Sequence, residues 1–251
     1  CNVPNLSTSL FFVVNDMPAE APQSSYALLP EGVIVSSLNK VAASHPELLE
    51  KYYNHAAAED RDFRTGHDGV TLLNTMLAQD GLLIYLPKNT VLKAPIQVVN
   101  VVSANMDMMC VRRVLIVAEE GAQGSVLFCD HAEGDKQYLT TQVIEAYAEE
   151  GAQVNIYSIE ETNDNTTRFS TLYVEQEAKS RISYDGIVLT CGKSRNRLDV
   201  RLRGEEARAE LYGAVIADGE QRVDNNILVE HLSPKCTSDM LYKYVLDGQS
   251  N

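Results

Sequence analysis

The pattern of hydrophobic and polar positions changes near residue 82. From there to about residue 231, short runs rich in β-branched residues and tyrosine alternate with short acidic turns, as in residues 90–102 and 111–128. Alternation of this kind predicts β-strands. We therefore expect a region dominated by strands over most of the chain.

The first 81 residues have a different pattern. Residues 10–14 (LFFVV) predict a strand, and residues 44–47 (SHPE) predict a helix start, with Ser44 as N-cap of a capping box and proline in the first turn. A second helix is predicted over residues 68–79, ended by Asp-Gly at 80–81. Its apolar positions have helical spacing and predict one buried face: Val70, Leu73, Met76 and Leu77.

Segments of the strand-rich region repeat. EEGAQ begins at residues 119 and 149, QEAKS at residue 176 and GEEAR at residue 204. Alignment on the alanine matches Ala122, Ala152, Ala178 and Ala207, at intervals of 30, 26 and 29 residues. Ala94 is a weaker earlier copy.

A period of this length without helices between the copies is typical of a parallel β-helix, in which a small alanine fits each tight corner. The predicted fold class is mainly β, a right-handed parallel β-helix (solenoid) preceded by a short α-helical N-terminal segment. Residues 1–81 form the N-terminal strand and helical region, and residues 82–251 form the β-helix core. An ordinary β-sandwich with chance similarity at its turns is the alternative.

A β-helix has two open ends, whose unpaired backbone groups must be covered or paired. The predicted N-terminal helices can cap one end. Residues 232–251 predict a short helix or strand and no cap. We therefore expect a chain truncated at its C-terminal end, or one that completes its sheet against a partner.

Charge and composition narrow the function classes. Thirty-five acidic residues outnumber 21 basic ones, for a net charge of −14. This balance opposes binding to nucleic acid or to an anionic membrane. No run approaches the ~18 apolar residues of a membrane-spanning helix. Phosphate-binding glycine loops and the serine-hydrolase elbow are absent from the sequence, so the chain is not expected to be an enzyme.

The five cysteines favour buried free thiols in a reducing compartment, because they are widely spread and include no C-x-x-C pair. They are Cys1, Cys110, Cys129, Cys191 and Cys236. Cys1 has two interpretations, a boundary left by processing or cloning and a lipid-modified N-terminal cysteine.

Few other residues suggest chemistry. His131 and Cys129 could contribute two ligands to a metal site, but their acidic, glycine-containing context favours a loop. The acidic pairs at 160–161 and 205–206 are interpreted as solvated turns. Alternation at Arg112-Arg113 points one arginine inward, where it needs a buried acidic partner. His231 and Cys236 lie five residues apart, with packing as the alternative to chemistry.

Several longer motifs carry a family resemblance. They are residues 72–89, 112–132, 140–161, 214–226 and 231–250, and the last contains His231-x-x-Pro234-x-Cys236-x-Ser238 followed by Tyr242-Lys243. From about residue 8 to its end, the chain resembles the SufB/SufD family of iron–sulfur cluster assembly scaffold proteins. Within that family it resembles the SufD members, as a core fragment.

The resemblance implies a non-catalytic scaffold subunit of a cytoplasmic SufBCD complex, active in cluster assembly and in iron acquisition under iron or oxidative stress. It also implies a SufB-like paralogue and the SufC ABC-type ATPase as partners, with ATP hydrolysis by SufC. We expect no tightly bound cofactor, only a transient iron–sulfur cluster on the complex. The family's docking and cluster-site residues would lie beyond Asn251. Within the chain, Cys236 is a soft candidate ligand for iron or persulfide, and His231 a candidate iron ligand or proton acceptor.

Two other functions stay open at this point. One is an extracellular β-helix protein, a polysaccharide lyase or adhesin, anchored through a lipid on Cys1. The other is a solenoid that only mediates association between proteins.

Overall fold

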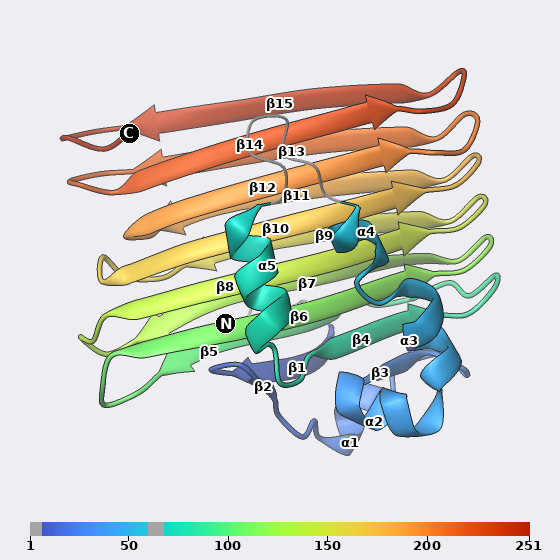
Figure 1. Ribbon diagram of the computed structural model, residues 1–251, viewed down its shortest axis with the longest axis horizontal. Coiled ribbons are helices and arrows are strands. Elements are labelled where there is room, and N and C mark those ends of the chain that lie inside the picture. Colours follow the sequence, from blue (N-terminus) through green and yellow to red (C-terminus); the bar gives the residue numbers. More distant parts are fainter. Residues whose placement is uncertain (1–6, 60–67) are drawn as a thin grey trace.

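The computed structural model describes residues 7–59 and 68–251, and it shows a parallel β-solenoid of about six coils (Figure 1). The predicted mainly β fold class is confirmed. Each coil contributes one strand to each of two facing sheets. The strands of the first sheet are β3 (Ile34–Ser37), β4 (Leu82–Leu86), β6 (Met108–Ala118), β8 (Tyr138–Ala148), β10 (Thr166–Gln176), β12 (Lys193–Leu202) and β14 (Arg222–His231).

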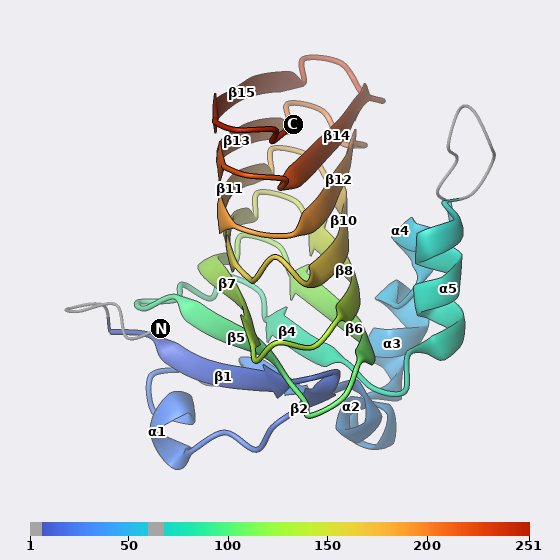
Figure 2. The ribbon, with the colours of Figure 1, turned by 90° about the vertical axis from the view of Figure 1, so that its left-hand side faces the viewer.

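The second sheet pairs the same coils in parallel register, except for β2, which runs antiparallel to β1. Its strands are β1 (Ser9–Val14), β2 (Met17–Pro18), β5 (Ile96–Ser103), β7 (Gln123–Glu133), β9 (Gln153–Glu161), β11 (Arg181–Thr190), β13 (Arg208–Ala217) and β15 (Thr237–Leu246). Within residues 7–59 and 68–251 there are also five short helices: α1 (Gln23–Tyr26), α2 (Leu38–Ser44), α3 (Pro46–Tyr52), α4 (His55–Ala58) and α5 (Gly69–Leu77). Because α3, α4 and α5 lie on the first sheet, we call it the helix-covered sheet and the second the opposite sheet (Figure 2). Among the described residues, no helix is both long and apolar enough to span a membrane.

One corner of each coil is a tight turn that ends in a small residue, as the repeats predicted. The residue before it has a positive φ, +69° at Gly121 and +68° at Gly151. The strand register matches Ala122 and Ala152 with Ser180 and Ala207, so the alignment on Ala178 was displaced by two residues. The corners are equivalent in backbone conformation and not in residue type. The residues with positive φ at the next three corners are not glycine: Lys179, Glu206 and Lys235.

Two further residues belong to this corner position. Val91 pairs with Gln123, so Thr90 occupies the register position of Ala122 on the preceding coil. Ala94 was therefore wrongly assigned as the earlier copy. At the other end, Thr237 pairs with Arg208, which places Cys236 directly above Ala207. The sequence alignment missed this copy because cysteine replaces alanine there.

The first coil is covered by the N-terminal segment. The predicted strand at residues 10–14 is confirmed as part of β1, which pairs with β5, while β3 pairs with β4. With α1 and α2 these strands close the end of the solenoid (Figures 1 and 2). The cap was predicted from the later helices, which instead lie on the side of the helix-covered sheet.

The predicted capping box is wrong. Ser44 is the last residue of α2, and its Oγ donates to the carbonyl of Lys40 3.0 Å away. His45 is the N-cap of α3 and makes no side-chain capping bond, while Pro46 stands in the first turn as predicted. Two consecutive short helices share this segment, which local sequence signals did not separate.

Helix α5 has its predicted start, because the Asp68 side chain accepts from the backbone N–H of Val70. Its predicted buried face is wrong. Thr71 and Asn74 are buried, whereas Met76 is 72% exposed. The Asn74 amide donates to the backbone carbonyls of Arg112 and Thr141 at 3.0 and 3.2 Å. Hydrogen bonds from Asn74 therefore join the helix to β6 and β8, and the apolar residues of the helix lie outside this interface with the sheet.

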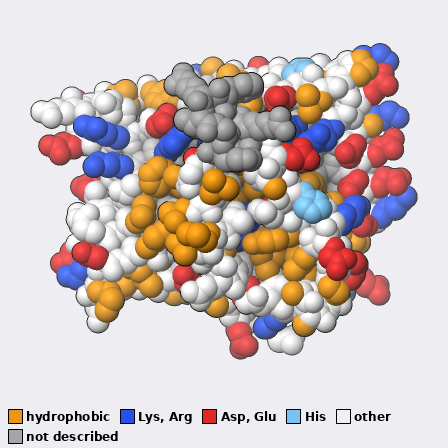
Figure 3. All heavy atoms as spheres, in the orientation of Figure 1, with side chains coloured by type: hydrophobic (Ala, Val, Ile, Leu, Met, Phe, Trp, Pro, Cys, Tyr) orange, Lys and Arg blue, Asp and Glu red, His pale blue; other side chains and the backbone are white. Residues whose placement is uncertain are grey.

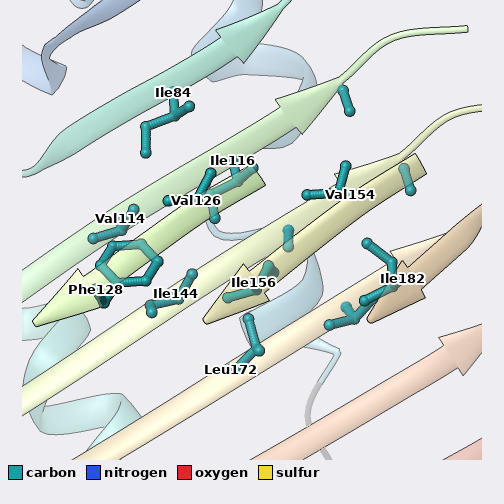
Figure 4. Packing of buried hydrophobic residues seen from close by; sticks show 14 of the residues in the cluster. Ile84, Val114, Ile116, Val126, Phe128, Ile144, Val154, Ile156, Leu172 and Ile182 are labelled. Carbon is teal, nitrogen blue, oxygen red and sulfur yellow. The ribbon is translucent and has the colours of Figure 1, made fainter. Parts of the chain in front are cut away.

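Aliphatic side chains fill one half of the space between the sheets (Figure 4). This aliphatic half comprises the ends of the helix-covered strands and the starts of the opposite strands. Its members are fully buried and stack coil on coil, among them Ile84, Ile116, Phe128, Ile156 and Ile182. Close packing here fixes the register of every coil.

The last coil is open. β14 and β15 are the edge strands of their sheets, and within the described residues nothing covers them. Residues 237–246 form a strand, the second of the two predicted possibilities, and it is exposed along nearly its whole length.

Candidate functional site

The other half of the interior is polar. It lies between the starts of the helix-covered strands and the ends of the opposite strands. We call it the charged half. Its buried members are Asn100, Arg112, Asp130, Gln142, Glu160, Arg168, Ser194 and Asn196.

Asp130 is the centre of the charged half. Its carboxylate accepts from Arg112 at 3.2 Å, from Arg168 at 2.7 Å and from the amide of Asn100 at 2.9 Å. Asp130 is 1% exposed and the two arginines 4% and 3%. Hydrogen bonds from neighbouring groups stabilise such a buried charge cluster, and here they satisfy Asp130 and the Nε and Nη1 of Arg112, while Nη2 of Arg112 is buried without a partner in the described part of the chain.

Glu160 extends this cluster by one coil. Its carboxylate accepts from the Ser194 hydroxyl at 2.6 Å and lies 3.5 Å from Arg168. The interpretation of residues 160–161 as a solvated turn is wrong for Glu160, which is 2% exposed within β9, although Glu161 is exposed. The strand continues two residues further than the turn signal indicated. Residues 205–206 are exposed in a turn, as predicted.

The two carboxyl groups respond to burial differently. Burial opposes ionisation of Asp130, but the charges of Arg168 and Arg112 outweigh it and hold the pKa of Asp130 below its ordinary value. At Glu160 burial is the larger effect and raises the pKa, although Arg168 opposes the rise. Asp130 is therefore the fixed negative charge of the cluster.

Both arginines of the 112–113 pair are buried, and each has an acidic partner. Arg112 points inward to Asp130, as alternation predicted for one of the two. Arg113 points to the other face of the sheet, 2.8 Å from Glu145 beneath the helices. Its guanidinium also donates to the side chain of Asn54 at 2.9 Å. This second buried pair ties the segment before α4 to the helix-covered sheet.

Tyrosine rings complete the charged half toward the open coil. A Cβ on Gly186 would lie 2.8 Å from the Tyr184 ring, and one on Gly213 would lie 2.1 Å from the Tyr242 ring. The glycines therefore leave the space that the rings occupy. The remaining cavity holds about 10 Å³, room for about one water molecule. The charged half is a packed polar core with no room for a larger ligand.

The candidate ligands His231 and Cys236 lie at the corner that closes the last coil. His231 is in register with Leu202 of the core, and its Nε2 lies 2.9 Å from the Ser238 hydroxyl. Cys236 packs against the aliphatic core, with its thiol 3.2 Å from the carbonyl of Gly204. Two coils below, Gln176 and Ser180 hold the same two register positions and are bonded at 3.3 Å. The fold thus brings the two candidates to one corner, with His231 exposed and Cys236 half-buried.

The other cysteines are placed as predicted for buried free thiols. Cys110, Cys129 and Cys191 are buried, and burial raises the pKa of Cys110 to about 11 and that of Cys191 to about 12. Such thiols are poor nucleophiles and metal ligands at neutral pH. Cys1 lies outside the described residues.

The prediction of a loop at His131 and Cys129 is wrong, because both residues lie in strand β7. The His131 ring lies 3.6 Å from the carboxylate of Glu161 on the next coil. Among the described residues, no three His, Cys, Asp or Glu side chains converge in a way that could hold a metal ion. Sequence reasoning missed Asp130 and Arg168, although their even spacing from the core residues Phe128 and Leu172 was a signal for inward placement.

Two family models cover nearly the whole chain. Residues 1–98 match the SufBD protein N-terminal region, and residues 100–251 match the SufBD core domain of the SUF system for FeS cluster assembly.

Curated relatives agree with these models. The chain is 24% identical over 233 residues to the chloroplastic iron–sulfur cluster assembly SufBD family protein ABCI8 of Arabidopsis thaliana, which covers 87% of this chain and 40% of that protein. It is also 24% identical over 228 residues to the iron–sulfur cluster assembly protein SufD of Bacillus subtilis, covering 88% and 49%. The chain thus spans less than half the length of these relatives. With both family models matched and the solenoid in place, the chain belongs to the SufBD family of iron–sulfur cluster assembly proteins.

Proposed function

We propose that this chain is a non-catalytic scaffold subunit of a cytoplasmic SufBCD-type complex, with a SufB-like paralogue and the SufC ATPase as partners. The observation that carries the proposal is the match of both SufBD family models to a β-solenoid whose interior is closely packed. A packed solenoid offers a rigid platform and no internal substrate pocket, so its function depends on what binds to its surface and edges. ATP hydrolysis is assigned to SufC, and a role in iron acquisition under iron or oxidative stress belongs to the same proposal.

The last coil presents two edge strands. The backbone groups of β14 and β15 that face away from the solenoid are available for pairing, and β15 exposes large apolar side chains. Exposed strand edges with apolar side chains favour association with further β-structure. In the proposed complex, the added strands come from the rest of the scaffold or from the paralogous subunit.

The test is a tagged full-length protein purified from its own cells. We expect an ABC-type ATPase and a second SufBD-family chain to co-purify in fixed stoichiometry. Recovery of the chain alone from a lysate in which both proteins are detected would contradict the proposal. The cell-surface alternative receives no support from the relatives described above, whose names refer to cluster assembly.

We further propose that the corner of His231 and Cys236 takes part in handling iron or persulfide as cargo of the complex. A half-buried thiol beside an exposed imidazole supplies one soft and one borderline ligand, and a cluster would need further ligands from partner chains. Cys236→Ser with His231→Ala in the full-length protein should lower the maturation of iron–sulfur enzymes in cells. Cys129→Ser, at a buried thiol away from this corner, is the matched control. Full maturation in the double variant would remove this part of the proposal and leave the scaffold function intact.

A further inference from the structure

A shallow cavity lies on the outer face of the helix-covered sheet, where strands β10, β12 and β14 begin. Its volume is about 440 Å³, within the range of small-molecule sites. Outward side chains from three adjacent strands line it: Phe169 from β10, Lys193 and Arg195 from β12, and Arg222 and Asp224 from β14. Figure 3 shows Lys and Arg side chains at this edge of the face, beside an area of hydrophobic side chains.

The cations of this cavity are poorly compensated. Among the described residues, every arginine except Arg222 forms an ion pair. Lys193 forms none either within residues 7–59 and 68–251. They are direct neighbours in the strand register. Like charges at such positions repel one another and reduce stability. Among the described residues, neither cation has a carboxylate within 4 Å, although Lys193 also borders a second pocket that is lined by Asp164, Asp218 and Glu220.

Arg195 also has donors to spare. Its one ion pair joins Nε to the carboxylate of Asp224 at 3.6 Å, and Asp224 is 70% exposed. The Nε has no hydrogen-bond partner. Among the described outward side chains that line this cavity, three are cationic and one, Asp224, is acidic, so an anion would find a favourable local field.

The remainder of the cavity is apolar. Phe169 is in register with Arg195, so its half-buried ring adjoins the guanidinium-bearing position. A ligand would thus meet an aromatic surface on one side and cations on the other.

We propose that this cavity binds a small organic anion, with an aromatic or branched aliphatic body on Phe169 and a carboxylate, sulfonate or phosphate group held by Lys193, Arg195 and Arg222. Such a site is separate from the interior and from the corner of His231 and Cys236. It would make the outer face of the sheet responsive to a small molecule. The proposal does not depend on the function proposed above.

The experiment is a fluorescence titration with 8-anilinonaphthalene-1-sulfonate, which joins an aromatic body to a sulfonate. We compare the unmodified chain with Lys193→Glu/Arg222→Glu and with the neutral pair Lys193→Gln/Arg222→Gln. Lys88→Glu/Lys179→Glu is the control, because it changes the net charge equally at exposed lysines of the corner turns. Thermal unfolding followed by circular dichroism shows that each variant is folded.

We expect the dissociation constant to rise about tenfold in the glutamate pair and severalfold in the glutamine pair, with the control within about twofold of the unmodified chain. Phe169→Ala should weaken binding without changing its dependence on salt. Equal weakening by the control would show that only net charge matters, and an unchanged constant in both cavity variants would show that the dye binds elsewhere. Either result overturns the proposal.

Discussion

The aliphatic and charged halves of the solenoid interior share one strand register but differ in what holds them together. In the aliphatic half, a side chain such as Ile116 stacks between the aliphatic side chains of Ile84 and Ala146 on the neighbouring coils. Each of these side chains contributes to stability through its own burial. In the charged half, Asp130 compensates two arginines at once, so the contribution of each group depends on its partners. The free energy contributed by apolar packing can therefore be assigned residue by residue, whereas the groups of a buried charge cluster stabilise the fold only together.

The largest expected effect is from Asp130→Asn. The change keeps the shape of the side chain but leaves Arg112 and Arg168 buried without their shared counter-charge, and we expect a loss of about 3–5 kcal/mol in the free energy of unfolding. Denaturant unfolding at neutral pH measures it. Asp224→Asn, at a 70% exposed carboxylate, is the control and should change stability by less than about 0.5 kcal/mol. A loss below about 1 kcal/mol in Asp130→Asn would mean that the cluster is not a unit.

Ile116→Ala tests the aliphatic half and should cost about 3 kcal/mol, from lost burial and the cavity left behind. Ile116 is 0% exposed, so no solvent can relieve the change. Ile116→Val should cost about 1 kcal/mol, because the loss follows the volume removed. If valine and alanine destabilised equally, the aliphatic half would not be divisible among residues in the way described.

Gly213→Ala tests whether the Tyr242 ring in the charged half requires a residue without a side chain at position 213. The added methyl group would lie 2.1 Å from the Tyr242 ring, so we expect a loss of about 1–3 kcal/mol. In a Tyr242→Ala background the same substitution should be nearly neutral. Gly69→Ala, where a Cβ meets nothing within 4 Å, is the matched control. Equal losses with and without the ring would show that the backbone, and not the ring, requires glycine.

The acid dependence of stability should separate the two carboxyl groups. Because the pKa of Asp130 is lowered in the folded chain, its contribution is present above its ordinary value of 3.8 and is lost as the pH falls toward the folded-state value. The slope from one such group is at most about 1.4 kcal/mol per pH unit. Asp130→Asn should flatten the decline below that pH.

Glu160 should act in the opposite direction. Its raised pKa gives a contribution that is present below its ordinary value of 4.5 and is lost as the pH rises through the folded-state value. Glu160→Gln should therefore leave the acid limb of the stability profile unchanged. A flattened acid limb in Glu160→Gln would reverse the assignment of the two groups.

Local patterns predicted the repeating parts of the fold well. Alternation and the corner alanines identified the solenoid, and helical spacing of apolar residues identified α5, whose N-cap is Asp68 in the structure. The errors arose where backbone conformation, and not residue type, determined the match. Lys179 adopts the left-handed turn conformation that glycine adopts at Gly121, so an alignment on alanine slipped by two residues.

The candidate site shows the same division. One inward arginine at 112–113 was predictable from alternation, but its partner Asp130 was not, because the two residues meet across the interior from opposite sheets. Glu160 was assigned to a turn because of the position of the acidic pair in the sequence repeat. Its burial depends on Arg168 and Ser194, which come from later strands.

By itself, the sequence determined the class of fold, the coil length and the small residue at three corners, Ala122, Ala152 and Ala207, because each depends on periodicity and local sterics. Only the tertiary structure decided which charges are buried together, that α5 contacts its sheet through Thr71 and Asn74, and that His231 and Cys236 share the last corner. Those features depend on contacts between residues distant in sequence, and no local pattern encodes the free energy of a contact whose partner is unknown.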